Sequence, residues 1–426
     1  AARPAVAQNR TRPPRALRFP VKILFFDVDG APFLSWEMAA LVRAGHEITV
    51  CGSRGIAPPW KSGEFEPIRS REIALRLFDG RALAALAYYF AARPLRTLAA
   101  LATAVLAYLR EPAYLLKLLA SLGWTLSACR WAELHAIDHV HANWAHLPAT
   151  SAWIVWRLTG IPFSFSGHAG RDLFRTKALL GKKVLDARFV VVCNHEARAR
   201  VLAVAGDEAG ARVHVHHHGV DIESFATAPA APEYLLSVGT LAPAKGFDLA
   251  IRAVAALREE GRTLRYRIVG DGEERRRLEA LATELGVRGQ VDFSGRMEGE
   301  ALTDAYRRAV ALLAPSRLLA DGGRDGLPNV VVEAMAAGVP VIASGVAAIP
   351  EAIDDGRSGI LVPPEDVYAL AAAVRNLLET EPESRRRLAA AARERVRRDF
   401  DRRRTVEGYC SLFAPLGGHT KEANQR

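Results

Sequence analysis

Strand and helix patterns alternate with great regularity over residues 234–379. Short apolar runs, such as 234–241 and 310–316, are each followed by a segment whose apolar residues recur at helical spacing. Strands joined through a helix run parallel, because a tight hairpin is not available to them. This half of the chain therefore predicts a doubly wound parallel sheet, and the Pro-rich, small-residue segment 222–232 before it predicts a linker.

The N-terminal half shows the same alternation less regularly. An apolar run at 21–30 ends in Gly30, a helix is expected at 35–44, and a second strand at 47–51. Further strands are expected at 139–147, 161–167 and 187–194. The chain is therefore expected to be an α/β protein with two sheets, and the natural ligand site lies at the carboxyl ends of the strands.

Residues 81–131 are rich in Ala and Leu and predict helices broken near Pro94 and Pro112. The longest stretch without a charge, Thr97–Leu109, has 13 residues, whereas a membrane-spanning helix needs about 20. A spanning helix is therefore not expected. Two alternatives remain: core helices packed on a sheet, or a partly exposed surface that contacts a bilayer or holds an apolar acceptor.

The net charge of +10 comes partly from residues 1–20, which hold five arginines, no acid and no apolar signal-peptide core. We expect this tail to be disordered. The basic excess has three interpretations: a solvated surface, attraction to anionic membranes or phosphate-bearing substrates, or nucleic-acid binding, for which no motif is present. The cysteines form no CxxC pair, which favours a cytoplasmic, reducing location and no thiolate zinc site. They are Cys51, Cys129, Cys193 and Cys410.

The most informative segment is 315–344, where a strand leads through a Gly-rich loop to a helix expected to begin at Pro328. Free amides at a helix start, together with the helix dipole, suit a diphosphate. Glu333 lies one turn further and suits hydroxyl groups such as those of a ribose. The alternative is an ordinary strand-to-helix connection with a solvated glutamate. The amides in question are those of Leu327, Asn329 and Val330.

Three other residues or loops follow expected strands. Lys245 could neutralise a phosphate, the loop in 268–274 could border a base, and His168 could donate a hydrogen bond or carry a proton. Each has a plain alternative, namely a surface lysine, a turn or a structural histidine. Since the fingerprint GxGxxG is absent, a dinucleotide site is not expected.

Two groups of histidines alternate along expected strands and raise the question of a metal. They are His139 with His141, and His214 with His216 and His218. No carboxylate or cysteine lies beside either group in the sequence, and HExxH is absent. We therefore expect no metal site.

Taken together, four motifs resemble the retaining glycosyltransferases of family 4, also described as glycosyl transferases group 1. They are DGLPNVVVEAMAAGVPV, in which seven residues separate Asp325 from Glu333, and VGTLAPAKGFD, VGDGEE and HHGVDIESF. The resemblance covers about 21–415 and is strongest over 234–365.

This resemblance implies the GT-B fold: two Rossmann-like, doubly wound parallel-sheet domains facing a central cleft. The implied activity is metal-independent, retaining hexosyl transfer from a UDP- or GDP-linked sugar to a glycan or lipid-linked acceptor in cell-surface polysaccharide or glycolipid synthesis. It needs no cofactor. The apolar helices 81–131 and the basic patches favour contact with the inner face of the cell membrane, and no contact with nucleic acid is expected. The implied parts are a tail at 1–20, an acceptor-side domain at 21–222 with the inserted helices 81–131, a donor domain at 233–395, a helix at 396–415 returning to the first domain, and a tail at 416–426.

The resemblance also implies roles for individual residues. Lys245 would clamp the diphosphate with the amides of Leu327, Asn329 and Val330, Glu333 would hold the ribose, and Asp325 would face the sugar hydroxyls. His168 would contact the transferring sugar. The base would lie near Gly270 and Glu273, and Gly30 would border the phosphates from the N-terminal side.

The sequence departs from the family pattern at three places. Asp325 stands where a glutamate is commoner, and Thr240 stands where an arginine is usual, so that one phosphate contact worth about 1.5–3 kcal/mol is missing. The first loop is VDGAPFLS rather than Gly-rich. Two alternatives therefore stay open: a nucleotide-sugar epimerase or hydrolase on the same fold, or a nucleotide-sugar-binding protein with a weakened site.

Overall fold

The computed structural model describes residues 20–27, 32–52, 72–74, 80–168, 170–174, 177–225, 231–320, 322–414 and 416. Gly30 and residues 226–230 of the expected linker lie outside these ranges. The described chain divides into two compact units. One holds residues up to Asn143, 147–164 and those from Val406 onward; the other holds 144–146 and 165–405. The domain boundaries expected at 222 and 395 stay a prediction.

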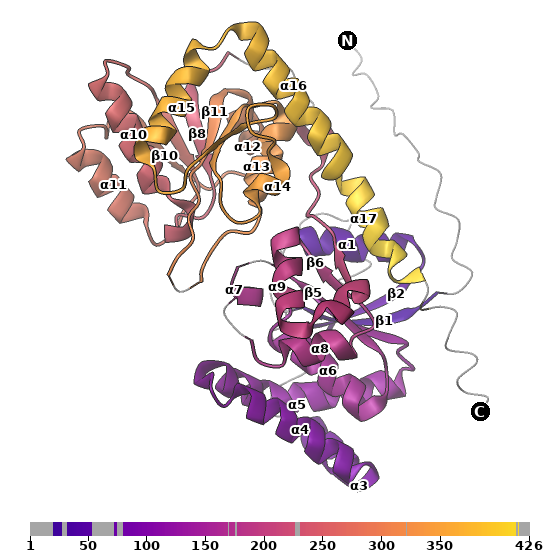
Figure 1. The fold of residues 1–426 in the computed structure, drawn as a ribbon. Coiled ribbons are helices and arrows are strands. Elements are labelled where there is room, and N and C mark those ends of the chain that lie inside the picture. The colour runs from indigo at the N-terminus through magenta and orange to yellow at the C-terminus, as the bar shows by residue number, and fades with distance from the viewer. Residues whose placement is uncertain are drawn as a thin grey trace, which may run out of the picture. The chain divides into compact units, whose positions relative to one another are not determined.

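The first sheet has seven strands in the order β3-β2-β1-β4-β5-β6-β7. Figure 1 labels β1, β2, β5 and β6 of this sheet. Its order reverses between β1 and β4, as in a Rossmann sheet, and the pairings are parallel. Its strands are β1 (Lys22–Asp27), β2 (Glu47–Gly52), β3 (Glu72–Ala74), β4 (His139–Ala142), β5 (Phe163–Gly167), β6 (Val190–Val192) and β7 (Val213–Val215). Its helices are α1 (Pro32–Arg43), α6 (Leu147–Thr159), α7 (Arg171–Phe174), α8 (Leu180–Asp186) and α9 (His195–Ala205).

The second sheet has six parallel strands in the order β10-β9-β8-β11-β12-β13, and this order reverses between β8 and β11. The α/β prediction is therefore confirmed. Its strands are β8 (Tyr234–Val238), β9 (Tyr266–Val269), β10 (Val291–Gly295), β11 (Ala309–Ala314), β12 (Val341–Ser344) and β13 (Ile360–Val362). Its helices are α10 (Phe247–Glu259), α11 (Arg275–Glu284), α12 (Gly299–Arg307), α13 (Asn329–Ala337), α14 (Ile349–Ala352), α15 (Val367–Glu379), α16 (Pro382–Asp399) and α17 (Arg402–Ser411), which carries the chain back into the first unit.

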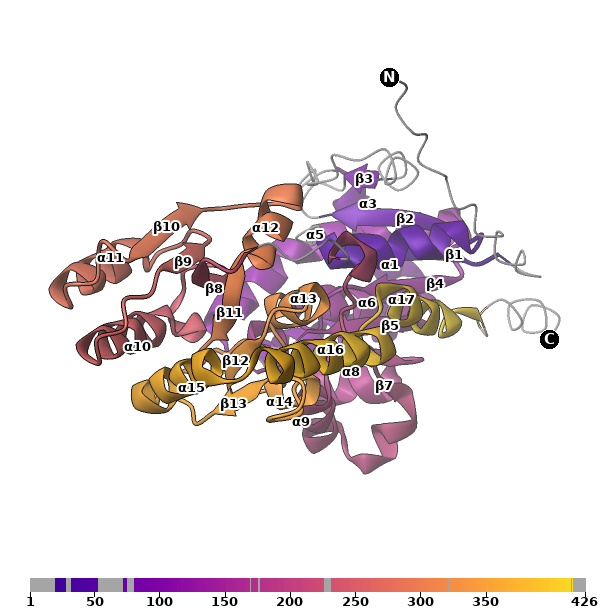
Figure 2. The ribbon, with the colours of Figure 1, turned by 90° about the horizontal axis from the view of Figure 1, so that it is seen from above.

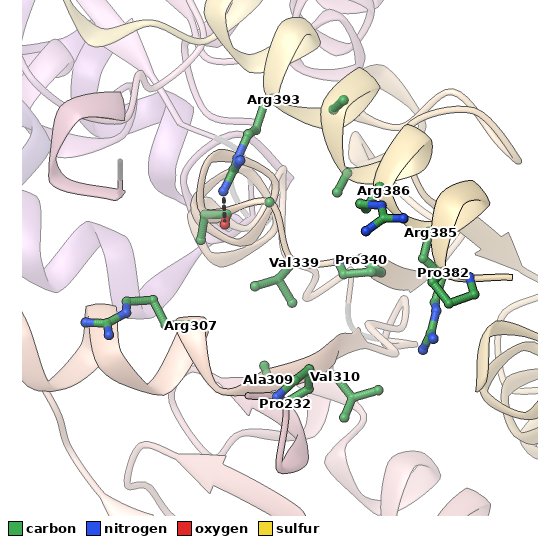
Figure 3. A pocket seen from close by; sticks show the side chains of 14 residues that line it. Pro232, Arg307, Ala309, Val310, Val339, Pro340, Pro382, Arg385, Arg386 and Arg393 are labelled. Atoms are coloured by element: carbon green, nitrogen blue, oxygen red, sulfur yellow. Dashed lines mark hydrogen bonds between the residues drawn. The ribbon is translucent and has the colours of Figure 1, made fainter. Parts of the chain in front are cut away.

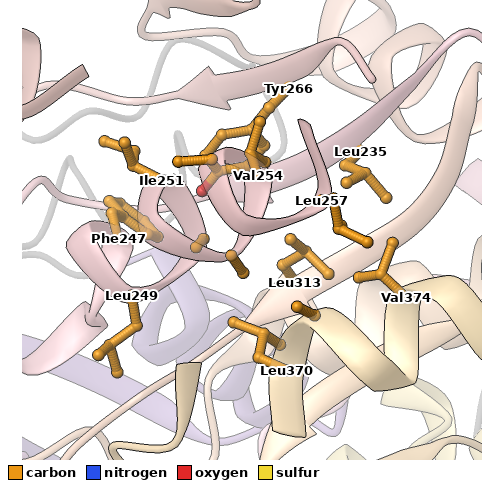
Figure 4. Packing of buried hydrophobic residues seen from close by; sticks show 14 of the residues in the cluster. Leu235, Phe247, Leu249, Ile251, Val254, Leu257, Tyr266, Leu313, Leu370 and Val374 are labelled. Carbon is orange, nitrogen blue, oxygen red and sulfur yellow. The ribbon is translucent and has the colours of Figure 1, made fainter. Parts of the chain in front are cut away.

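Buried side chains cover both faces of the second sheet. Helices α10 and α15 lie side by side on one face, where Phe247, Ile251 and Val254 recur at helical spacing and are buried with Leu313 and Leu370 (Figure 2, Figure 4). Helices α12, α13 and α16 supply the core of the other face. A sheet covered on both faces accounts for its nearly continuous apolar strands.

The Ala/Leu-rich segment forms α3 (Gly80–Ala92), α4 (Pro94–Tyr108) and α5 (Pro112–Leu134), and a proline occupies the first turn of α4 and of α5. One side of this group is core: the Tyr108 hydroxyl lies 2.8 Å from the Thr150 hydroxyl of α6. The other side exposes large apolar side chains. These are Leu83, Phe90, Leu95, Leu98, Leu106, Leu109, Leu116 and Leu119. Among the described helices, none combines the length and apolarity that crossing a bilayer requires.

Two expected strands are shorter than their patterns. β4 ends at Ala142, and β7 ends at Val215, so that His216 and His218 follow the strand instead of alternating along it. The neighbouring strand β6 ends at Val192, whose carbonyl accepts the last ladder bond from the His216 amide at 2.8 Å. Beyond that point β7 has no strand to pair with on that side.

Replacement of Gly246 by alanine tests the close backbone contact between the residue before α10 and the Pro315 carbonyl. Gly246 has a φ of +64°, and an added Cβ would lie 1.9 Å from the Pro315 carbonyl oxygen. We expect Gly246→Ala to lower the free energy of unfolding by about 3 kcal/mol, since backbone has to move. Gly261→Ala is the control, because its φ is +82° with nothing within 4 Å, and should cost about 1–2 kcal/mol. Urea unfolding followed by circular dichroism compares them; equal losses would contradict the packing argument.

Candidate functional site

The loops after β8, β9 and β11 are hydrogen-bonded to one another at the carboxyl edge of the second sheet. The amide of Leu241 donates to the Asp271 carbonyl at 3.0 Å, and the amide of Arg317 donates to the Ala244 carbonyl at 3.0 Å. These loops carry the motifs VGTLAPAKGFD, VGDGEE and PSRLLADGGRDGLP. The parallel order of the strands therefore brings together segments that are far apart in the sequence.

Glycine is required where the β8 and β9 loops touch. Gly270 has a φ of +146°, and a Cβ there would lie 1.9 Å from the Gly239 carbonyl oxygen. Since any side chain would push the two backbones apart, glycine at position 270 sets how closely the β8 and β9 loops approach each other. Its contribution is backbone shape, which suits the expected position beside a flat ring.

The Lys245 ammonium and the Asp325 carboxylate form an ion pair. Their Nζ and Oδ2 atoms lie 2.8 Å apart, and the Ser316 hydroxyl donates to the same carboxylate at 3.3 Å. Each of the two charged side chains is about one-fifth exposed. A cation at the end of β8 and an acid ahead of α13 thus meet, as the strand order requires.

Glu333 lies beside this pair, on α13. Its Oε2 accepts a hydrogen bond of 2.8 Å from the Tyr306 hydroxyl, which is fully buried in α12. Burial raises the pKa of Glu333 above its ordinary value, whereas the Tyr306 hydrogen bond and the nearby positive charge of Lys245 oppose that rise. Burial and the carboxylate also raise the pKa of Tyr306 well above its usual range, so the phenol remains a donor.

The start of α13 presents unoccupied backbone donors. Pro328 is the N-cap with a φ of −64° and a ψ of 125°, and its carbonyl accepts the Val331 amide at 3.0 Å. The helix therefore begins at Asn329, one residue after the expected Pro328. Within the ranges that the structure describes, no group accepts a hydrogen bond from the amides expected to bind phosphate. These are the amides of Leu327, Asn329 and Val330.

The other expected donor residues lie at the rim of the edge. Thr240 and Glu273 are exposed, on the β8 and β9 loops. Gly30 falls outside the described residues. Arg324, which precedes Asp325, forms an ion pair with Glu196, and its guanidinium lies 4.1 Å above the centre of the Phe174 ring.

His168 follows β5 and is buried. Its amide donates to Asp172 at 2.8 Å, and Trp144 meets its ring edge-on with centroids 4.8 Å apart. Asp172 also accepts the amides of Ala145 and His146. Burial raises the pKa of Asp172 to about 6, and these three amides oppose the rise. Asp172 thus ties the β4 and β5 loops together and orients the backbone of His168.

The loop containing His168 also touches the loop that precedes α13. A Cβ on Gly170 would lie 3.0 Å from the Arg324 carbonyl oxygen, so these two backbones come into near contact. Arg324 immediately precedes Asp325 in the chain. His168 and Asp325 are therefore carried by adjoining loops of the same compact unit.

A cavity of about 540 Å³ lies at the opposite, amino edge of the second sheet (Figure 3). Its arginines are largely engaged: Arg393 donates to the Ala337 carbonyl at 2.7 Å, and Arg386 pairs with Glu383. The carboxyl-edge site carries the converging charges and free amides, so we assign function to it and not to this cavity.

Sequence reasoning missed Tyr306 and Asp172. Tyr306 occurs in the amphipathic segment GEALTDAYRRA and resembles an ordinary core residue; only the contact of α12 with α13 brings it to Glu333. The signal for Asp172 was a carboxylate four residues after His168, at the start of a short helix. Position in the sequence alone could not show its three amide partners.

Tyr306→Phe tests the support of Glu333. Because burial raises the pKa of Glu333 in the folded protein, the folded state keeps this proton to a higher pH than the unfolded state does. The free energy of unfolding therefore falls as the pH rises from about 4.5 through the raised pKa. Loss of the phenol hydrogen bond raises the pKa further. We therefore expect a loss of about 1.5–3 kcal/mol near pH 7.5 and a smaller loss near pH 4.5.

Tyr266→Phe is the matched control, since its buried hydroxyl donates to a neutral group, Ser237 Oγ, at 2.8 Å. Its cost should be about 1 kcal/mol at both pH values. Urea unfolding at each pH measures both variants, and a pH-independent loss in Tyr306→Phe would count against the assigned ionisation of Glu333.

Known proteins resemble this chain in sequence and in fold. Residues 221–395 match the family described as glycosyl transferases group 1. The chain is 34% identical over 209 residues to the putative colanic acid biosynthesis glycosyltransferase WcaL of Escherichia coli, which covers 48% of this chain and 52% of the relative. It is 32% identical over 308 residues to a D-inositol 3-phosphate glycosyltransferase of Saccharomonospora viridis, which covers 65% of this chain and 69% of that relative.

Solved structures share the fold at low identity. The structure of Anabaena Alr3699/HepE in complex with UDP superposes with a TM-score of 0.68 at 17% identity, over 93% of this chain and 100% of that one. A sucrose-phosphate synthase of Thermosynechococcus elongatus gives 0.69 at 20%, over 93% and 99%. The match to the colanic acid relatives spans about half of their length. The motifs, the two Rossmann-like sheets and these relatives together show that the chain belongs to the glycosyl transferases group 1 family and has the GT-B fold.

Proposed function

We propose that this protein is a retaining, metal-independent glycosyltransferase of family 4. It moves a hexose from a UDP- or GDP-linked donor to a glycan or lipid-linked acceptor in cell-surface polysaccharide or glycolipid synthesis. The observation that carries the proposal is the meeting of Lys245, Asp325 and the free amides at the start of α13 beside Glu333.

The relatives support this choice of reaction. Two are named for the biosynthesis of bacterial polysaccharides, colanic acid and amylovoran. Structural neighbours were solved in complex with UDP and with UDP-glucose. These properties belong to those proteins, and we extend them to this chain because its strand-end loops carry the motifs that resemble the family.

Cleavage of a sugar–diphosphate bond develops negative charge on the leaving phosphate. The Lys245 ammonium and the amides of Asn329 and Val330 would lie against that charge and stabilise it as it forms. Such preorganised donors supply the positive charge that a metal ion supplies elsewhere. Glu333 would accept hydrogen bonds from the ribose hydroxyls, because its Tyr306 contact occupies only one of its oxygens.

The ion pair between Lys245 and Asp325 defines the state before the donor arrives. The arriving diphosphate would compete for the ammonium, since two phosphates carry more charge than one carboxylate. Asp325 would then turn to the hydroxyls of the sugar. The donor would thus activate its own site by exchanging one ion pair for another.

Retention follows if the acceptor attacks on the face that the diphosphate leaves. The departing phosphate would take the acceptor's proton, and His168, positioned through Asp172, would contact the sugar as its ring acquires positive charge. Closure around the donor would limit hydrolysis. We place the enzyme in the cytoplasm, a reducing compartment that keeps cysteines as thiols.

Removal of the two charged side chains should suppress transfer. We expect Lys245→Ala and Glu333→Ala each to lower kcat/KM by about 10²-fold, because each removes a contact made to the donor in the transition state. Lys182→Ala and Glu300→Ala remove exposed residues of the same types and should leave the rate unchanged. Rates are measured from labelled donor with a membrane or glycan extract; near-normal rates in both site variants would refute the assignment.

The same extracts separate the three candidate activities. A transferase yields labelled glycan or lipid with the anomeric configuration of the donor, and its rate persists in EDTA. An epimerase returns a new nucleotide sugar, and a hydrolase releases free sugar. Thermal stabilisation by UDP, GDP or their sugars without any turnover would instead support the binding protein with a weakened site.

The exposed side of α3, α4 and α5 is the proposed acceptor-side membrane contact. Residues 80–131 contain six basic side chains and one acid, Glu111. The exposed basic residues lie among the exposed leucines, a combination typical of interfacial helices on anionic lipid. They are Arg81, Arg96, Arg110 and Lys117.

Liposome flotation tests this contact. The triple change Leu95→Gln, Leu98→Gln and Leu106→Gln removes exposed apolar area from α4 and should reduce the fraction bound to anionic vesicles about 10-fold or more. The control Leu318→Gln with Tyr368→Gln removes exposed apolar side chains elsewhere and should float like the unchanged protein. Equal flotation of both variants would exclude the helices as the contact.

A further inference from the structure

Three adjacent strands of the first sheet are each followed by a potential metal ligand: a histidine, a cysteine and a histidine. His168 follows β5, Cys193 follows β6, and His218 lies three residues after β7. One potential ligand atom from each residue lies within 4.8 Å of the other two. In the sequence, 24 residues separate each member from the next, which is why spacing alone gave no indication of the group.

The two imidazoles already have the separation of a metal site. His168 Nδ1 and His218 Nε2 lie 3.3 Å apart. Two nitrogens bound tetrahedrally at about 2.0–2.1 Å from zinc are about 3.3–3.4 Å apart. A rotation about the Cys193 side chain would bring its sulfur to the third corner.

The surroundings suit neutral imidazoles and a thiolate. His168 and Cys193 are buried, at 7% and 8% exposure. The side-chain amide of Asn194 donates to the Cys193 sulfur at 3.5 Å, a contact that favours negative charge on the sulfur. Trp144 packs on His168 and restricts its ring.

We propose that His168 Nδ1, Cys193 Sγ and His218 Nε2 bind one thiophilic divalent cation, Zn²⁺ in the cell. Two imidazoles and one thiolate form a ligand set that zinc accepts, and three protein ligands leave a fourth position for water. On binding, the thiol proton leaves to solvent, and the imidazole proton between the rings moves to the outer nitrogen of its own ring. No electron is transferred.

A second cluster shows what distinguishes this site. His195, His217 and Glu351 also lie within 4.8 Å of one another. The Glu351 carboxylate is already engaged in hydrogen bonds. It accepts them from the backbone amides of His195 and Glu196 and from the His217 ring nitrogen. A cation there would have to displace these bonds, and that cluster lacks the soft sulfur ligand that Cys193 supplies to the first one.

The site has a consequence that rests on the proposed function. A cation on Nδ1 would fix the ring of His168, the residue proposed to contact the sugar, and would place positive charge near the developing oxocarbenium. Micromolar zinc would therefore inhibit transfer, although transfer itself uses no metal. Binding is measured without turnover, so failure of this inference and failure of the proposed function are distinguishable.

The test is titration of the purified full chain with Co²⁺ and then Zn²⁺. We expect one equivalent of Co²⁺ to produce a thiolate-to-metal charge-transfer band with the visible bands of tetrahedral cobalt, and Zn²⁺ to abolish both. Cys193→Ser should remove the charge-transfer band. Cys193→Ser and His218→Asn should each weaken Zn²⁺ binding by about 100-fold, which is at or above the loss typical of a residue that only supports a metal ligand.

Cys410→Ser and His214→Asn are the matched controls, since both remove half-buried residues of the same types outside the cluster. They should bind like the unchanged protein. Absence of a thiolate band, or a band that survives in Cys193→Ser, would overturn the proposal. Circular dichroism checks folding, and if Cys193→Ser does not fold, undiminished binding by His218→Asn would overturn it alone.

Discussion

The ion pair between Lys245 and Asp325 joins the two loops on which the site depends. One follows β8 and the other precedes α13, and the two strands, β8 and β11, are neighbours at the point where the sheet order reverses. In open α/β sheets this reversal opens a crevice at the carboxyl edge. The pair holds a cation in place without donor, and close backbone contacts at Gly246 and Gly270 keep the loops from relaxing away from it. Glu333 then requires its own support from Tyr306, because burial disfavours its charge.

The fold was largely predictable because its determinants are local. Regular alternation of apolar strands and amphipathic helices predicts parallel sheets, and Pro94 and Pro112 mark the starts of α4 and α5. The site was predictable as a set of strand-end residues, since parallel strands bring their carboxyl ends together. Side-chain partners were not predictable: Tyr306 reaches Glu333, and Asp172 collects three amides, only through packing between elements. The predicted end of a strand was also wrong where the neighbouring strand stopped first. β7 ends at Val215, before His216 and His218.

The helices α3 to α5 show why two interpretations of an apolar segment can both hold part of the answer. Small residues such as Ala100 and Ala104 and the polar Thr97 are buried against the fold, while leucines of the same helices face outward. A soluble core helix normally places its leucines inward. The exposed leucines of these helices lie among exposed arginines, and it is this combination on which our proposal of a membrane contact rests.

His168, at the carboxyl edge of the first sheet, takes part in two of our proposals, contact with the sugar and metal binding. His168 is held by Asp172 through its backbone and by His218 through its ring, so its side chain and its main chain are controlled by different partners. This separation matters because a change at the ring, such as metal binding, need not disturb the loop that Asp172 anchors. Since the Arg324 backbone touches Gly170 two residues further on, the same loop also borders Asp325. The carboxyl edge of the second sheet gathers charged side chains, and the carboxyl edge of the first sheet gathers softer donor atoms. In each sheet this follows from strands that run in the same direction.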